Sequence, residues 1–215
     1  MNVVILAAGD FPTHPVPLRA LHEADFVIYC DSAYSQLTTQ HSALTTDFVV
    51  IGDGDSLSES DKRNLGDRWI HVAEQDYNDL HKAMVWISDE FDHSSLKITI
   101  LGATGKREDH TLGNISYLVT FAEEYPGIDI EMLTDHGRFV ALHGTHTCPS
   151  FPKQQVSMFV LDPSTSLTSD GLRWPLQDFH PRTWWQASLN EALGNNFTLT
   201  SSNWVILFQT YEPKG

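Results

Sequence analysis

Cysteine is scarce in this sequence, and so is positive charge. Two cysteines, Cys30 and Cys148, occur among 215 residues and do not form a CxxC pair. Their spacing gives no sign of a disulfide framework, and we expect two buried thiols in a reducing cytoplasm. The 11 histidines are scattered without an HExxH motif, so they give no support for a zinc site.

The charge balance excludes one class of function. The chain has 13 Lys and Arg residues against 28 Asp and Glu residues, which gives a formal net charge of -15. A general nucleic-acid binder needs a basic surface, so we expect no nucleic-acid partner. Binding of a phosphate ligand stays open, because a metal ion can bridge carboxylates to phosphates.

Long hydrophobic runs are also missing. No apolar stretch is long enough to cross a bilayer, so we expect no membrane partner. The N-terminal stretch MNVVILAAGDFPTHP lacks the basic segment of a signal peptide, and its short apolar run ends in a Gly-Asp turn signal. That run is therefore predicted as a first strand.

Apolar runs rich in Val and Ile alternate with helical patterns through the first two thirds of the chain. Expected strands lie within 2–9, 25–31, 47–55, 67–76 and 95–105, and two more flank a turn at 135–137; expected helices lie within 17–24, 77–91 and 110–127. This alternation predicts a mostly parallel, Rossmann-like α/β domain over 1–143.

The pattern changes after residue 143. Short strand-like segments, turn residues and several tryptophans occupy 154–163, 165–176 and 196–212, and a short helix is expected within 181–193. We predict a small all-β domain over 144–215.

Carboxylates follow the expected strands. Asp53 and Asp55 in GDGD repel one another, so they share a cation, serve a helix terminus or have nothing in common. Asp31, Asp79 and the segment 102–109 also follow strands. Because the carboxyl ends of parallel strands meet at one edge, we expect these groups to gather there. The alternative is that polar loops simply end the strands.

Those residue types fit a metal and a phosphate. Mg²⁺ takes hard oxygen ligands such as Asp53 and Asp55. Asp79 begins a helix, where an acid is also favoured by the helix dipole, and Lys82 on the same face can reach a phosphate or neutralise Asp79. These assignments leave a purely capping role for Asp79 open.

The stretch GATGKREDHTLGN is a turn that leads into a helix. Gly102 and Gly105 allow a ligand close to the backbone, and the helix start attracts anions. Arg107 can form two hydrogen bonds to phosphate oxygens, and Asp109 can cap the helix or join the metal ligands. The loop has neither GxxxxGK[ST] nor GxGxxG, so it indicates phosphate binding only beside the acidic residues.

Seven short stretches stand in a fixed order: LAAG, CDSAY, GDGDS, QDYNDLHKAM, GATGKREDHTLGN, GLRWPL and TSSN. This set, which spans nearly all of the chain, resembles the thiamin pyrophosphokinase family. The family's usual forms are an Asp-Gly-Gly-Ala turn, GDxDS, DQxxTDxxKA, GxxGxRxDHxxxN and a terminal SxSN. This sequence departs from them at Ser32-Ala33, Asn78 and Thr200, and no departure removes a charged group.

The resemblance implies an α/β nucleotide-binding domain followed by a β-sandwich, usually as a homodimer with sites between subunits. It implies transfer of diphosphate from ATP to the hydroxyethyl oxygen of thiamin, with Mg²⁺ as the metal, giving thiamin diphosphate and AMP. The implied Mg²⁺ ligands are Asp53, Asp55 and Asp79, with Asp31 beside them; the ATP and diphosphate contacts are Gln75, Asn78, Lys82, Arg107 and Asp109; the thiamin pyrimidine contacts are Thr200, Ser202 and Asn203.

Two points stay open within this interpretation. Most tryptophans are expected in the core or an interface, with Trp174 favoured for stacking on the thiamin rings. The general base is not assigned: Asp31 or Asp79 can serve, or metal and positioning suffice.

Three other functions also stay open. One is a diphosphokinase for another alcohol, such as a hydroxymethyl pterin; TSSN favours thiamin. The second is an inactive nucleotide-binding or thiamin-binding module, which has no need of so many carboxylates. The third is a metal-dependent phosphohydrolase.

Overall fold

The computed structural model describes residues 1–35 and 46–214 and divides the chain into two compact units, Met1–Asp135 and His136–Gly215. The boundary lies earlier than the expected one at 143/144. The physical reason is strand β7 (Gly137–Pro149), which continues through Gly144 and pairs on both sides of it with strand β11 (Asn196–Pro213). A domain boundary at Gly144 would cut this antiparallel ladder.

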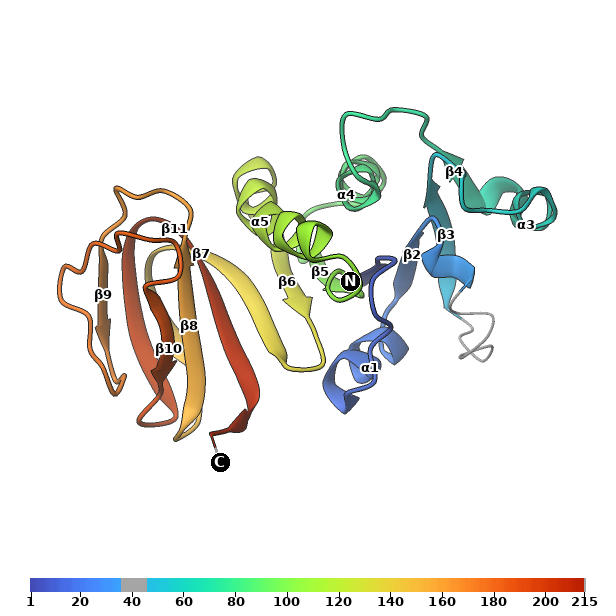
Figure 1. Ribbon diagram of the computed structural model, residues 1–215. Helices are drawn as coiled ribbons and strands as arrows, with labels where there is room; N and C mark the ends of the chain where they lie inside the picture. The colour runs from blue at the N-terminus through green and yellow to red at the C-terminus, as the bar shows by residue number, and fades with distance from the viewer. Residues whose placement is uncertain (36–45, 215) are drawn as a thin grey trace. The chain divides into compact units, whose positions relative to one another are not determined.

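The first unit is built on a parallel sheet. Within its described residues the strand order is β6-β5-β1-β2-β3-β4, and every adjacent pair is parallel (Figure 1). The strands are β1 (Asn2–Leu6), β2 (Phe26–Cys30), β3 (Asp47–Gly52), β4 (Trp69–His71), β5 (Lys97–Leu101) and β6 (Asp129–Leu133). The predicted parallel α/β domain is therefore confirmed.

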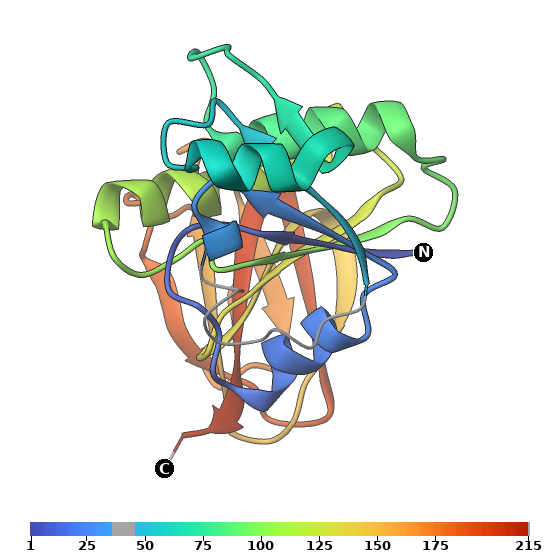
Figure 2. The same cartoon turned by 90° about the vertical axis from the view of Figure 1, so that its right-hand side faces the viewer.

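Helices cover both faces of this sheet. Helices α4 and α5 lie on one side and α1 on the other (Figure 2). The helices are α1 (Pro15–His22), α3 (Glu59–Leu65), α4 (Asp79–Glu90) and α5 (Glu108–Glu124), with a 3-10 turn η1 (Gly66–Arg68) after α3. The start of α4 is set by Asn78, whose Oδ1 accepts a hydrogen bond from the His81 amide at 3.1 Å.

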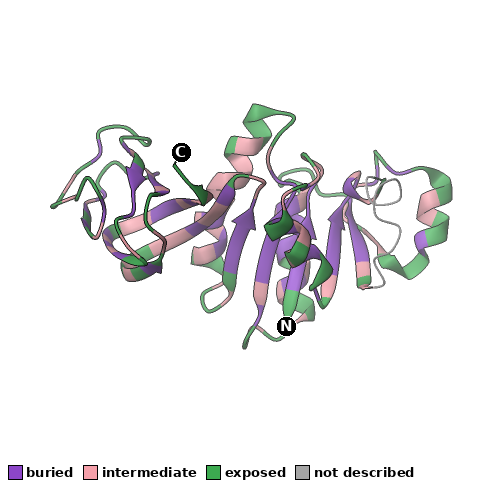
Figure 3. Cartoon of the chain, turned by 90° about the horizontal axis from the view of Figure 1, so that it is seen from below, coloured by how far each residue is buried: buried purple, intermediate pink, exposed green. Residues whose placement is uncertain are grey.

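Burial explains why the central strands read as continuous apolar runs. In β1, β2 and β5 the residues after the first are buried, as the purple strands of Figure 3 show. Strands covered on both faces bury every side chain rather than alternate ones. Burying one such Val, Ile or Leu side chain stabilises the fold by about 1.5–3 kcal/mol. These strands therefore keep the carboxyl edge of the sheet, from which the polar loops start, in a fixed position.

The second unit is all β, as predicted. Its strand order is β10-β8-β11-β7, with β9 paired to β11, and the pairs are antiparallel. The remaining strands are β8 (Gln154–Val160), β9 (Leu167–Asp170) and β10 (Ala187–Glu191). The expected helix within 181–193 was wrong, because residues 187–191 form β10 and pair with β8.

No helix among the described residues combines the length and apolar character needed to span a bilayer.

Candidate active site

Three carboxylates converge at the carboxyl edge of the sheet. Asp31 follows β2, and Asp53 and Asp55 follow β3. One oxygen of each can be chosen so that all three lie within 4.8 Å of one another. We call Asp31, Asp53 and Asp55 the carboxylate cluster. Its assembly follows from parallel β2 and β3, whose pairing brings the ends of the two strands side by side.

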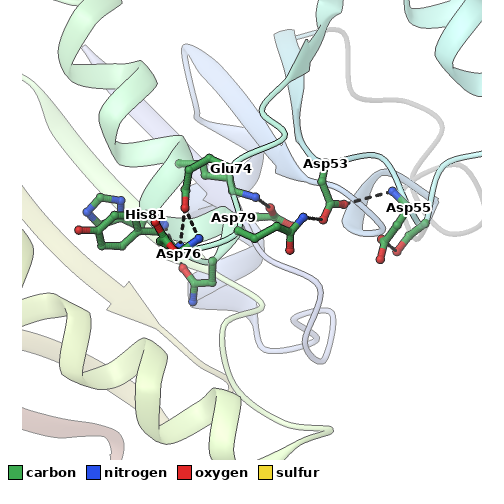
Figure 4. A network of polar contacts seen from close by, with 11 residues as sticks. Asp53, Asp55, Glu74, Asp76, Asp79 and His81 are labelled. Carbon is green, nitrogen blue, oxygen red and sulfur yellow. Dashed lines mark hydrogen bonds and ion pairs between the residues drawn. The ribbon is translucent and has the colours of Figure 1, made fainter.

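A network of short contacts fixes the Asp53–Asp55 turn. The Asp55 amide donates to Asp53 Oδ1 at 3.1 Å, and Gln75 Nε2 donates to Asp53 Oδ2 at 2.7 Å (Figure 4). The Gln75 hydrogen bond lowers the pKa of Asp53. Gly54 has φ +77°, and a Cβ at this position would lie 2.7 Å from the Trp69 ring. Glycine is therefore required here for both backbone and space.

Asp31 supplies the buried member of the cluster. Its residue is 5% exposed, and its Oδ1 has no hydrogen-bond partner among the described residues. Burial raises the pKa of Asp31, a hydrogen bond with the Ser56 side chain opposes that shift, and the carboxylates of Asp55 and Asp79 add to it. A buried carboxylate that has one unpartnered oxygen and lies beside two other carboxylates fits a hard cation, and Mg²⁺ takes such ligands.

Asp79 and Lys82 lie beside the cluster at the start of α4. The side chain of Lys82 is 5% exposed, and its Nζ lies 3.3 Å from Asp79 Oδ1. Burial raises the pKa of Asp79, and the ammonium of Lys82 opposes that shift. Asp79 is thus paired with a lysine rather than placed in the three-carboxylate group, and its role as a metal ligand stays a prediction.

A cavity of about 310 Å³ opens onto these groups. It brings together the predicted residues Asp31, Asp53, Asp55, Gln75, Asn78, Asp79 and Lys82. Five polar or aromatic lining residues lay outside the predicted site: Ser32, Ser56, Tyr77, His110 and Asn114. Three of them carried a signal, because Ser56, His110 and Asn114 stand at fixed positions of the family forms GDxDS and GxxGxRxDHxxxN.

The loop between β5 and α5 lines a neighbouring cavity of about 270 Å³, to which Gly105, Lys106 and Arg107 contribute. Arg107 Nε donates to Asp109 Oδ1 at 3.0 Å, and this contact lowers the pKa of Asp109 to about 2. Asp109 therefore pairs with Arg107 and stands outside the carboxylate cluster. It is not the cap residue of α5, which is Arg107, but its Oδ1 accepts a hydrogen bond from the His110 amide in the first turn at 2.9 Å.

An amide chain joins the two cavities. Asn78 Nδ2 donates to Asn114 Oδ1 at 3.0 Å, and Asn114 Nδ2 donates to the Ala103 carbonyl at 2.8 Å. Asn78 replaces the family's Thr, and its side chain both caps α4 and reaches α5. Gly102, the other predicted loop glycine, accepts from the Gly9 amide at 2.7 Å.

Gly9→Ala is expected to destabilise this edge. A Cβ on Gly9 would lie 2.3 Å from the Thr104 carbonyl oxygen and 2.4 Å from that of Gly102, both of them backbone atoms. Overpacking of this kind costs about 1–3 kcal/mol of unfolding free energy, which chemical denaturation measures. Gly113→Ala is the matched control, because its Cβ would meet nothing within 4 Å. Equal stability of the two variants would contradict the close approach of the loops.

Asp31→Asn is expected to stabilise the metal-free protein. It removes one of three crowded like charges, and Asn tolerates the φ of +39° at this position. A gain of about 1 kcal/mol raises the melting temperature by roughly 2–4 °C in EDTA. Mg²⁺ should raise the melting temperature of the wild type, and this increase should be lost in Asp31→Asn. Asp67→Asn, at an exposed position, is the control; an undiminished Mg²⁺ effect in Asp31→Asn would contradict the assignment.

The predicted thiamin residues lie in the second unit and make internal contacts. Thr200 Oγ1 lies 3.0 Å from Thr145 Oγ1, the Ser166 amide donates to Ser202 Oγ at 2.8 Å, and Asn203 Nδ2 donates to Ser164 Oγ at 3.2 Å. Trp174 lines a different cavity, of about 270 Å³, with Leu176, Gln186, Ala187, Ser188, Leu189 and Asn190. Roles of these four residues in binding stay predictions.

Residues 18–131 match the family model for the thiamin pyrophosphokinase catalytic domain, and residues 137–208 match that for its substrate-binding domain. The chain belongs to the thiamin pyrophosphokinase family. The resemblance inferred from the motifs is thereby confirmed, and the two matches meet close to the boundary between the structural units.

Comparison with individual proteins agrees with membership of the thiamin pyrophosphokinase family. Thiamine pyrophosphokinase 1 of Oryza sativa subsp. japonica is 33% identical over 143 residues, which are 60% of this chain and 53% of that protein. The chain thus spans about half the length of the curated relatives it matches.

Solved structures share the fold. Thiamine pyrophosphokinase from Bacillus subtilis has a TM-score of 0.77 at 22% identity, covering 98% of this chain and 99% of that one. Yeast thiamin pyrophosphokinase has a TM-score of 0.80 at 18% identity, covering 97% and 86%.

Proposed function

We propose that the protein transfers diphosphate from ATP to the hydroxyethyl oxygen of thiamin, giving thiamin diphosphate and AMP. The observation that carries this proposal is the carboxylate cluster, with its unpartnered buried oxygen, in the same cavity as Lys82. A site with three acids and one buried cation is suited to a metal-bound polyphosphate. Membership of the thiamin pyrophosphokinase family is what supports thiamin as the acceptor of the diphosphate.

The metal proposed for this site is Mg²⁺, held by Asp53 and Asp55 with Asp31 or Asp79. When bound, it neutralises the phosphate oxygens and stabilises charge that develops on them. Lys82 is held against Asp79 at 3.3 Å, so its ammonium faces the same cavity without free rotation. Arg107 and the glycines 102 and 105 are proposed to bind the remaining phosphate oxygens through the adjoining loop.

The proposed reaction forms one bond and breaks one. The hydroxyl oxygen of thiamin attacks the β-phosphorus, and the bond between the β-phosphorus and the oxygen bridging to the α-phosphorus breaks. AMP leaves with that oxygen, and the hydroxyl proton passes to a carboxylate or to water. Asp31 and Asp79 are the candidate acceptors, because burial raises the pKa of each.

Three finer proposals accompany this function. Thr200, Ser202, Asn203 and Trp174 are proposed to hold thiamin. A homodimer is proposed because unit two exposes large apolar side chains, including Trp184, Trp185 and Leu193; analytical ultracentrifugation tests it against a 24.2 kDa monomer. A cytoplasmic location is supported by two buried free thiols, and cell fractionation tests it.

Acceptor dependence tests the proposed function. The protein is incubated with ATP and Mg²⁺, with thiamin, with a hydroxymethyl pterin, or with neither, and AMP release is followed. We expect AMP only with thiamin. AMP with the pterin alone would favour the other diphosphokinase, whereas phosphate or AMP release without any acceptor would favour a phosphohydrolase.

A further inference from the structure

An exposed aromatic ring lies at the rim of the acidic cavity, and neither the motifs nor the reaction accounts for it. Tyr77 lines that cavity and is 51% exposed. It stands at one of the variable positions of the family's DQxxTDxxKA motif, so the family pattern assigns it no role. Aromatic side chains that line a cavity are typical ligand contacts, which makes Tyr77 a candidate for one.

The ring is held in place by other aromatic side chains. Tyr77 stacks on His81 with ring centroids 4.1 Å apart and planes 13° apart. The His81 ring in turn lies beside two aromatic rings of α5, with centroid distances of 5.8 Å to Tyr117 and 6.0 Å to Phe121. One face of the Tyr77 ring is therefore covered by a supported stack, which leaves the other face for a ligand.

The loop that carries the ring is also fixed. Glu74 Oε1 accepts a hydrogen bond from the Tyr77 amide at 3.2 Å and another from the Asp76 amide. Asn78, the next residue, caps α4. Because backbone and ring are both held before a ligand arrives, little conformational entropy remains to be lost on binding.

The position of the ring relative to the charged groups indicates which ligand it meets. Figure 4 shows Glu74, Asp76 and His81 at one end of the polar network, Asp53 and Asp55 at the other, and Asp79 between them. A ligand with phosphates at the carboxylate end and a flat ring at the Tyr77 end matches this layout. A nucleoside triphosphate has both parts in one molecule.

We propose that Tyr77 is the stacking platform for the base of the nucleotide substrate. The inference rests on the proposed function, because it assumes that the cavity binds ATP. Stacking alone distinguishes bases weakly, since every base has a π-face, and purines stack with more area than pyrimidines. Thiamin is the less favoured occupant, because its predicted contacts belong to the second unit.

Equilibrium binding without thiamin tests the platform. Isothermal titration calorimetry measures MgATP and magnesium tripolyphosphate, which has no base, on the wild type and on Tyr77→Ala, Tyr77→Phe and Val85→Ala. Tyr77→Ala should weaken MgATP binding roughly 5-fold to 150-fold and leave tripolyphosphate binding unchanged. Tyr77→Phe should bind as the wild type does. Val85→Ala, an exposed apolar truncation on the α4 helix that follows this loop, should have no effect.

The outcomes separate this inference from the proposed function. A wild type that binds no MgATP overturns both. If the wild type and Tyr77→Ala bind MgATP with equal affinity, the stacking platform is overturned and the proposed function is not. The same holds if Tyr77→Ala loses affinity for MgATP and for tripolyphosphate equally. If Tyr77→Ala raises the KM for thiamin and leaves that for ATP unchanged, the ring meets the acceptor instead, which also overturns it.

Discussion

Asp53→Asn is expected to lower kcat for AMP release by roughly 10²–10³, the loss that follows removal of one strong electrostatic contact to a transition state. Asp53 accepts two hydrogen bonds, from Gln75 Nε2 at 2.7 Å and from the Asp55 amide at 3.1 Å. Asparagine keeps the size of the side chain and removes its charge. The measurement is AMP release at saturating ATP, thiamin and Mg²⁺.

The control for Asp53→Asn is Asp67→Asn, which neutralises an exposed acid in η1 of the same unit. Its kcat should equal that of the wild type. Unchanged melting temperatures of both variants would show that the fold is intact. If Asp53→Asn retains activity within a few-fold of the wild type, the cluster is not the metal site, and the acids at this edge serve only to end strands.

Lys82→Met is expected to affect both stability and activity. The lysine is nearly fully buried and pairs with Asp79, whose side chain is 30% exposed. Removing it leaves Asp79 and the cluster without their buried cation, at a cost of about 1–3 kcal/mol of unfolding free energy, below that of a fully buried pair because water still reaches Asp79. Activity should fall as well, since the phosphate loses a cationic contact.

The double variant Lys82→Met/Asp79→Asn separates these two effects. It removes both charges of the pair, so denaturant unfolding should show most of the lost stability recovered, while activity stays low. Lys62→Met is the control, because Lys62 pairs with exposed Glu59 on α3 at 3.1 Å and such pairs contribute about 0.5 kcal/mol or less. Full activity in Lys82→Met would contradict a role for the lysine in phosphate binding.

The gathering of carboxylates at one edge of the sheet could be predicted from the sequence, because it depends only on the order and direction of the strands. Alternating strands and helices imply parallel strands, and parallel strands place Asp31, Asp53 and Asp55 at the same edge whatever the details of the loops. The motif spacing then identified the family. The same reasoning predicted that Lys82 shares a helix face with Asp79, which the 3.3 Å contact confirms.

The partner of each polar side chain could not be predicted in the same way. Asp109 had two predicted roles, yet it pairs with Arg107 two residues earlier, because loop torsions decide which groups meet. The segment 187–191 had a helical pattern, but pairing with β8 overrode it. Tyr77 gave no signal at all, since its significance comes from His81 behind it and the cavity in front.

The proposed function depends most on which bond of ATP is broken and on which molecule receives the diphosphate. The most direct measurement is the molar ratio of AMP to thiamin diphosphate formed by the wild type with Mg²⁺, ATP and thiamin, followed by ³¹P NMR. We expect equal amounts of AMP and thiamin diphosphate, with no ADP and no thiamin monophosphate. Formation of ADP, or of AMP with free diphosphate and unchanged thiamin, would contradict the proposed function.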